Sequence, residues 1–191
     1  MLFLRRNTKF NKLGIKTAQD LMKYFKDNLN YGFVYKNKIF TDLKPDFQKN
    51  MDKLYKIRLG LDFIKNKYGV CWDFCQLERF FFLQNNIEHT CYFIESYINC
   101  QKGGPTHTFA LYQQNDKWYW FEYSWFYHRG IWEYSSKEEA LKDILLKFEK
   151  FFGKKLFNIK MYKTDKVTKR LDAFQFVEHC LKGQKVEIDK K

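Results

Sequence analysis

Apolar residues recur at helical spacing in the first part of the chain. Thr17 is a suitable N-cap, and Asp20 lies three residues later, near the positive end of a helix that would start there. Leu21 and Phe25 then fall on the same face of that helix. Residues 17–29 are therefore predicted to form an amphipathic helix.

A second stretch of helical spacing precedes Gly69. Its apolar positions are Leu54, Ile57, Leu61 and Ile64. On this basis residues 46–66 are predicted to be largely helical. Gly69 interrupts the pattern, and residues 71–85 predict a further helix with one apolar side.

Strand-like sequence dominates the middle of the chain. Residues 33–35 and 90–98 predict single strands. Residues 106–112 and 117–124 predict the two strands of a hairpin, because both are rich in β-forming residues. The polar residues 113–116 are expected to form its turn.

The remaining segments complete the predicted fold class. Residues 100–105 contain two glycines and a proline and predict a loop. The C-terminal third predicts a strand at 131–134, a helix capped by Ser136 that runs to Phe152, a strand at 157–162 and a helix at 171–181. Helices at both ends of an antiparallel sheet are typical of an α+β fold. The length of 191 residues predicts a single domain, 1–191, with a core at about 17–163.

Composition and charge narrow the classes of protein. Hydrophobic residues make up 45% of the chain and aromatic residues 20%, which argues against disorder. The net charge of +13 suggests attraction to nucleic acid, anionic lipid or acidic protein. The lysines are scattered, however, and scattered lysines are typical of a solvated surface. We therefore expect no specific nucleic-acid partner, although a nucleic-acid binder stays an alternative.

The cysteines and the apolar runs predict the compartment. The five cysteines are Cys71, Cys75, Cys91, Cys100 and Cys180. An odd count without a disulfide-like pattern suggests a reducing compartment. No apolar stretch approaches the length of about 20 residues that a membrane helix needs, and no apolar region follows Arg5 and Arg6 as in a signal peptide. A cytoplasmic protein without membrane association is expected.

Cys71 is the candidate nucleophile. Its predicted place at the start of a helix matters, because unpaired N–H groups and the helix dipole favour the thiolate. The same N–H groups can stabilise an oxyanion formed when the sulfur attacks a carbonyl. Gly69, two residues earlier, gives the backbone freedom to present the sulfur.

A nucleophilic cysteine needs a base, and His107 is the best placed of the four histidines, at the start of a predicted strand. An orienting carboxylate should reach the other imidazole nitrogen. Glu122 lies fifteen residues later on the next strand. If the hairpin turns at 113–116, Glu122 comes close to opposite His107, and cross-strand partners are about 5 Å apart.

These motifs resemble the transglutaminase-like superfamily. The matching pieces are Gly69-Val70-Cys71-Trp72-Asp73, then Thr106-His107-Thr108-Phe109, then Trp120-Phe121-Glu122, and they fall in order within roughly residues 17–135. In that family a cysteine opens a helix, a histidine follows on a strand and an acid on the next strand. Many members carry Asp where this chain has Glu122, which adds one methylene.

The resemblance implies a papain-like α+β core in which the nucleophile helix packs on an antiparallel sheet. It also implies acyl chemistry on amide bonds of a protein or peptide, without metal or cofactor, as a peptidase, deamidase or transamidase. Cys71 would attack the carbonyl and His107 would protonate the leaving amine. A second oxyanion donor usually comes from upstream of the cysteine in this family, and Tyr31 and Asn66 are candidates.

Other interpretations of the same residues remain open. Cys71 alone could be a buried structural thiol, and the chain could be a non-catalytic binding module with an aromatic cleft. Trp72, Trp125 and His128 are the candidates to line a substrate-binding cleft. A metal set is also conceivable, although the Cys-x3-Cys spacing is looser than a usual zinc pair; its members would be Cys71, Cys75, His89 and Cys91. Acyl transfer from a small thioester, as in arylamine acetyltransferases, is a further enzymatic variant, and the oligomeric state is left open.

Overall fold

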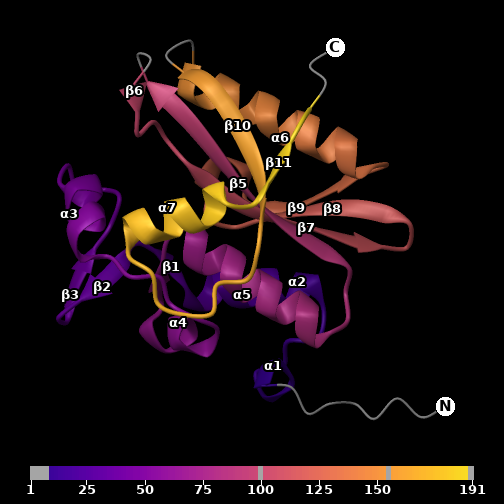
Figure 1. Ribbon diagram of the computed structural model, residues 1–191. Coiled ribbons are helices and arrows are strands. Elements are labelled where there is room, and N and C mark those ends of the chain that lie inside the picture. Colours follow the sequence, from indigo (N-terminus) through magenta and orange to yellow (C-terminus); the bar gives the residue numbers. More distant parts are fainter. Residues whose placement is uncertain (1–8, 99–100, 154–155, 189–191) are drawn as a thin grey trace.

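The computed structural model describes residues 9–98, 101–153 and 156–188 (Figure 1). Its centre is an antiparallel sheet of seven strands in the order β11-β10-β5-β7-β8-β9, with β6 paired to β5. The strands are β5 (His89–Ile98), β6 (Gln101–Lys102), β7 (His107–Gln114), β8 (Lys117–Glu122), β9 (Gly130–Tyr134), β10 (Leu156–Thr164) and β11 (Gln184–Val186). The predicted α+β class is confirmed.

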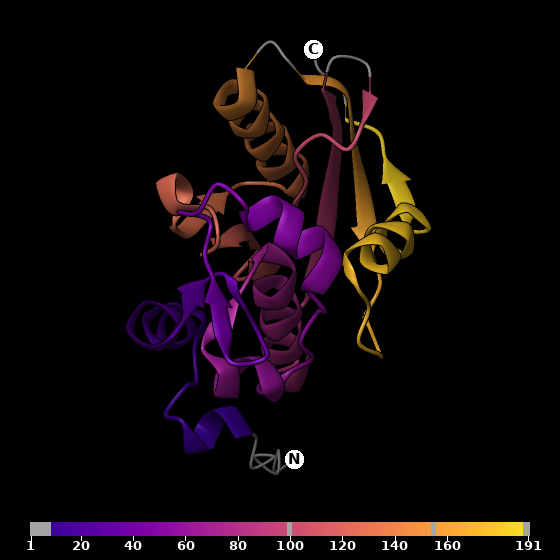
Figure 2. The ribbon, with the colours of Figure 1, turned by 90° about the vertical axis from the view of Figure 1, so that its left-hand side faces the viewer.

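Helices cover both faces of this sheet (Figures 1 and 2). Side chains alternate along β7, so that Phe109 and Leu111 pack beneath α6 (Lys137–Phe152), whereas Ala110 and Tyr112 face the other side. That other side carries α2 (Ala18–Asn28), α5 (Cys71–Gln84) and α7 (Ala173–Leu181). Because both faces are buried, the strands lack the apolar-polar alternation of a one-sided sheet.

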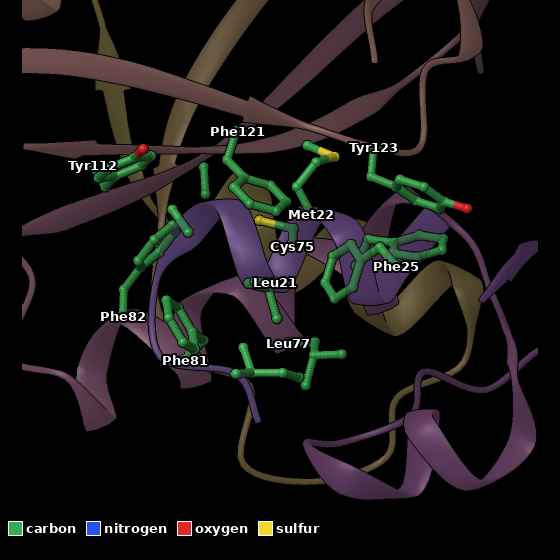
Figure 3. Close-up of a cluster of buried hydrophobic side chains, with 14 of the residues drawn as sticks. Leu21, Met22, Phe25, Cys75, Leu77, Phe81, Phe82, Tyr112, Phe121 and Tyr123 are labelled. Atoms are coloured by element: carbon green, nitrogen blue, oxygen red, sulfur yellow. The ribbon is translucent and has the colours of Figure 1, made fainter. Parts of the chain in front are cut away.

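An aromatic cluster fixes α5 on the sheet. Figure 3 shows its side chains from α2, α5 and the strands meeting in one layer. The labelled members are Leu21, Met22, Phe25, Cys75, Leu77, Phe81, Phe82, Tyr112, Phe121 and Tyr123. Edge-to-face pairs such as Phe25 with Phe121, whose ring centroids are 5.6 Å apart, connect the helix layer to the strands. This packing sets where the first residue of α5 lies.

The N-terminal helix follows its sequence pattern. The Thr17 hydroxyl accepts the Asp20 N–H at 3.0 Å, and the Asp20 carboxylate accepts the Thr17 N–H at 2.9 Å. This reciprocal capping box starts α2 one residue after Thr17. The helix predicted at 17–29 is therefore confirmed, and the structure adds a short helix before it, α1 (Lys9–Lys12).

The prediction of one largely helical segment at 46–66 is wrong in its middle. The structure has two helices, α3 (Phe47–Leu54) and α4 (Leu61–Asn66). Between them the chain is extended, because the Ile57 N–H donates to the Leu171 carbonyl at 2.9 Å. Gly60 then turns the chain with a φ of 50°, a conformation that favours glycine. The long-range hydrogen bond between Ile57 and Leu171 thus prevents a continuous helix, although the apolar residues have helical spacing.

Four short strands lie before α5. The predicted strand at 33–35 is confirmed as β2 (Phe33–Tyr35), and it forms a hairpin with β3 (Lys38–Phe40). Outside this hairpin, β1 (Asn30–Tyr31) pairs in parallel with β4 (Tyr68–Gly69). This last pair was not predicted, and it brings the region of Tyr31 beside the chain that enters α5.

Two predicted connections differ in detail. The turn expected at 113–116 contains only Asn115 and Asp116, both with positive φ, which is the pattern of a tight two-residue hairpin. Both strands are therefore paired up to this turn. The loop expected at 100–105 includes the short strand β6, while Cys100 lies outside the described residues.

The C-terminal elements agree with the sequence to within a few residues. Ser136 caps α6 as predicted, and its hydroxyl accepts the Glu139 N–H at 3.1 Å. The strand predicted at 157–162 is the longer β10, and the helix predicted at 171–181 starts at Ala173 behind the N-cap Asp172. None of the helices in the described part of the chain combines the length and apolar character needed to cross a bilayer.

Candidate active site

Cys71 is the first residue of α5, and Asp73 holds the chain in place at that point. The Asp73 carboxylate accepts the Val70 N–H at 2.8 Å and the Arg58 N–H at 2.7 Å. Only 1% of Asp73 is exposed. Burial raises the pKa of Asp73 to about 6, although the two N–H groups act in the opposite direction. The carboxylate therefore joins the entry to α5 with the segment that precedes α4.

Gly69 is required for close packing. The prediction from the sequence, that this glycine gives the backbone freedom, is wrong. A Cβ at Gly69 would lie 2.4 Å from the Phe63 ring and 2.8 Å from the Asp73 Cβ. Any side chain would force these groups apart. Glycine is therefore needed so that the strand can pass between the Phe63 ring and the first turn of α5.

His107 and Glu122 form a buried pair at one end of the β7–β8 hairpin. The His107 Nε2 lies 2.7 Å from one Glu122 oxygen. The other oxygen accepts the Trp125 N–H at 2.7 Å and the Ser124 hydroxyl at 2.9 Å. Because all three partners converge on one carboxylate, its orientation toward the imidazole is fixed.

Glu122 lies close to opposite His107, as expected, and the pairing of the two residues is diagonal. The paired register of the hairpin ends at Ala110 and Phe121. His107 lies three residues before that pair and Glu122 one residue after it. Diagonal neighbours are about 7–8 Å apart at the backbone. The longer side chain of Glu, relative to Asp, suits this separation.

Cys71 lies beside the His107 side chain, close enough to raise the pKa of the imidazole. Since Nε2 faces Glu122, the thiol is left with Nδ1. Burial lowers the pKa of His107, but the charge of Glu122 and the neighbouring Cys71 outweigh it and raise this pKa to about 10. The three residues that the sequence singled out are thus brought together, with the imidazole in the middle.

Of the two candidate oxyanion donors, Tyr31 reaches the site. The pairing between Tyr31 and Gly69 brings Tyr31 close to Cys71, two residues after Gly69. Burial, followed by the negative charges of Cys71 and Asp42, raises the pKa of Tyr31 well above its usual value. Asn66 instead donates its side-chain amide to the Asp62 carbonyl within α4.

The three candidate substrate-binding residues separate into two groups. Trp72 is only 3% exposed, and its ring stacks on Phe176 of α7 at 4.4 Å, so its role is packing. Trp125 lies against the imidazole, and the centroid of its ring is 5.4 Å from the centroid of the His107 ring. His128 contacts Trp125 edge-on at 4.4 Å and is partly exposed. Trp125 and His128 therefore border the site, whereas Trp72 does not.

The metal interpretation has no geometric support in the described residues. Within 9–98, 101–153 and 156–188, no group of three or more His, Cys, Asp or Glu side chains is arranged to hold a metal ion. Cys75 and Cys91 do lie close to each other, since the Cys91 thiol approaches the Cys75 carbonyl at 3.9 Å. Cys75 on α5 and Cys91 on β5 are both buried in the core between this helix and the sheet.

Sequence reasoning missed the structural role of Asp73, which it included only as the last residue of the motif that begins at Gly69. The signal was present, because an acid three residues after an N-cap is typical of a capping arrangement. The contacts of Ser124 and Trp125 with Glu122 left no comparable signal. They depend on how the chain turns after β8, and no local pattern encodes that turn.

Comparison with known families gives one match. The family described as a transglutaminase-like domain matches residues 7–142. This range includes all three residues of the buried triad and ends within α6. No curated protein and no solved structure matched the chain.

Replacing Asp73 by Asn should destabilise the protein, because an amide nitrogen would face one of the two backbone N–H donors. An unsatisfied buried group costs about 1–3 kcal/mol, so we expect the free energy of unfolding in urea to fall by about that amount. Asp62→Asn, in the exposed first turn of α4, is the matched control. Equal losses in both variants would contradict the anchoring role.

Replacing Glu122 by Gln should lower the pKa of His107 toward its ordinary value, because the largest influence that raises it is the Glu122 charge. NMR titration of the His107 ring protons measures this. In the unmodified protein the ring should stay protonated until the pH nears 10, and in the variant it should titrate well below that. Glu133→Gln, an exposed change on β9, serves as control; an unchanged titration in Glu122→Gln would remove Glu122 from this role.

Proposed function

The chain belongs to the transglutaminase-like domain family, and from this premise we propose that it is a cysteine enzyme that acts on amide bonds through an acyl-enzyme on Cys71. The observation that carries the proposal is the buried arrangement in which His107 is hydrogen-bonded to Glu122 and lies beside Cys71, which is a further cause of its raised pKa. The substrate class that we propose is a protein or peptide. Such a relay activates the thiol and needs no metal or cofactor.

The reaction uses the proton that His107 holds. Cys71 Sγ, as thiolate, bonds to the substrate carbonyl carbon, and the electron pair of the C=O bond moves to oxygen. When that pair returns, the C–N bond breaks and the imidazolium gives its proton to the leaving amine. Water or another amine then attacks the thioester and regenerates Cys71. Water as acceptor gives peptidase or deamidase activity, and an amine gives transamidation.

Two features support stabilisation of the oxyanion at the start of α5. Cys71 is the first residue of α5, and a helix start can stabilise negative charge that develops beside it. Tyr31 lies beside Cys71, because it pairs with Gly69. Because the pKa of Tyr31 is raised, its hydroxyl stays protonated at neutral pH and can donate to an oxyanion. We therefore assign Tyr31 as the second donor.

The proposed nucleophile works only as a reduced thiol. Cys71, Cys75, Cys91 and Cys180 are all free thiols in the structure. A reducing compartment, of which the cytoplasm is the example expected from the sequence, would keep them so. No specific nucleic-acid partner enters this proposal.

Iodoacetamide should alkylate Cys71 faster than the other four cysteines at neutral pH, as measured by peptide mapping. His107→Ala should slow this labelling roughly tenfold or more, because the thiolate loses its cationic partner. His128→Ala is the matched control, since it removes an imidazole that also contacts Trp125 but not the relay. Equal labelling of all cysteines, or no effect of His107→Ala, would refute the proposed nucleophile and base.

Tyr31→Phe should separate two reactions of the same thiol. Acylation of Cys71 by p-nitrophenyl acetate forms an oxyanion, so removal of one donor should slow it by about 10²-fold or more. Alkylation by iodoacetamide forms no oxyanion and should keep its rate. Tyr24→Phe on α2 is the control. If Tyr31→Phe slows both reactions equally or neither of them, Tyr31 is not an oxyanion donor.

A further inference from the structure

Four exposed aromatic side chains gather where the short 3-10 helix η1 (Phe126–His128) meets the C-terminal end of α6. These are Phe126, Tyr127, Phe151 and Phe152, with 67%, 72%, 46% and 37% of their surface exposed. We call this group the aromatic surface. Aromatic rings are rarely left in water side by side without a function in binding.

The rings of the aromatic surface form one continuous group. The centroid of Tyr127 lies 5.6 Å from that of Phe126 and 5.6 Å from that of Phe151. Phe151 in turn lies 4.8 Å from Phe152. Two separate elements, η1 and α6, therefore contribute to a single apolar area.

Trp125 connects this area to the proposed base. Its ring lies 5.4 Å from the Phe151 ring on one side and 5.4 Å from the His107 ring on the other. Its backbone N–H also donates to Glu122. A polypeptide that covers the aromatic surface would therefore lie one ring away from His107.

The aromatic surface is held in place before any partner binds. The Arg129 Nε donates to the Tyr123 carbonyl at 2.6 Å. The same guanidinium lies 4.4 Å from the Tyr123 ring and 5.1 Å from the Phe126 ring. Phe151 and Phe152 are part of a helix whose inner face is buried. Rigid aromatic groups bind with little loss of conformational entropy.

Positive charge lies at the edge of the aromatic surface. Arg129 lies over Phe126, and the exposed Lys150 precedes Phe151 on α6. The whole chain carries a net charge of +13. These charges favour a partner with acidic residues beside its apolar ones and disfavour a basic one.

We propose that the aromatic surface binds a segment of the protein substrate that carries apolar side chains flanked by acidic residues, while a neighbouring part of the same chain reaches Cys71. This inference rests on the proposed function and names the substrate class of that site. The aromatic surface is continuous with Trp125 and His107. We therefore infer that the substrate binds there, rather than a second copy of this chain.

Three chloroacetyl-capped peptides test the inference. Each reacts by bond formation from Cys71 Sγ to the methylene carbon with loss of chloride. The first carries the sequence Gly-Gly-Glu-Leu-Phe-Glu-Leu, the second has Ser in place of Leu and Phe, and the third has Lys in place of Glu. The rate of Cys71 labelling is measured by intact mass, and burial of one or two apolar side chains should make the first peptide about tenfold faster than the second.

Variants identify the surface responsible. Phe126→Ser combined with Tyr127→Ser should abolish the difference between the first two peptides, and Phe151→Ser alone should reduce it. Neither should change the rate with iodoacetamide. Phe174→Ser, an equally exposed phenylalanine on α7, is the matched control and should keep the full preference.

Each outcome decides one point. If Cys71 of the unmodified protein reacts with none of these reagents, the proposed function itself is refuted. Normal iodoacetamide labelling with equal rates for the first two peptides, or a preference unaffected by the surface variants, would refute docking at the aromatic surface alone. A third peptide as fast as the first would refute the preference for acidic flanks. A dimer that the double variant turns into a monomer would show that a second copy covers the surface instead.

Discussion

The two hydrogen bonds from backbone N–H groups to Asp73 are the constraint on which the proposed site depends. They hold Val70 and Arg58 against one buried carboxylate, and they fix the angle at which the chain enters α5. The relay from Cys71 through His107 to Glu122 requires each polar atom to lie within hydrogen-bonding distance of the next, so a small shift at the start of α5 would separate sulfur and imidazole. Gly69 contributes to the same constraint, because its missing side chain leaves room for the Phe63 ring. The acid and the glycine act on geometry without touching the reacting atoms.

The sheet carries His107 and Glu122, the other two residues of the proposed site. The aromatic side chains on both faces of the sheet hold these two residues in position. Both faces of the sheet are covered, so its strands carry large apolar side chains inward on either side, and the hairpin of β7 and β8 is held from above and below. That support keeps His107 and Glu122 at the same end of the hairpin despite their diagonal offset. Glu122 uses both of its oxygens, one on the imidazole and one on the turn after β8. The turn is thus fixed by the same carboxylate that orients the base.

Local patterns in the sequence were sufficient to predict most helices and strands, and insufficient to predict the long-range contacts between them. Capping signals at Thr17 and Ser136 predicted two helix starts correctly, because a cap is a local interaction between residues three apart. Helical spacing of apolar residues gave a wrong prediction at 46–66, where the Ile57 N–H donates to the Leu171 carbonyl more than a hundred residues away. Trp72 was misassigned for a related reason: its partner Phe176 lies on a helix that no local pattern ties to α5. Parallel pairing of Tyr31 with Gly69 is equally non-local, so the sequence alone left Tyr31 and Asn66 as equal candidates.

Burial of the triad has a consequence for how a substrate could be selected. Cys71 is 6% exposed and His107 7%, so little surface near the sulfur is available to distinguish one side chain from another. Affinity must then come from contacts made outside the relay, since binding energy from remote parts of a substrate can be used to position the reacting bond. The exposed aromatic rings that adjoin Trp125 are an apolar area of this kind. They are connected to the imidazole through the Trp125 ring, and the backbone N–H of Trp125 donates to Glu122. A partner bound there would press on the same tryptophan that packs against the base, so recognition and the alignment of His107 would share one contact.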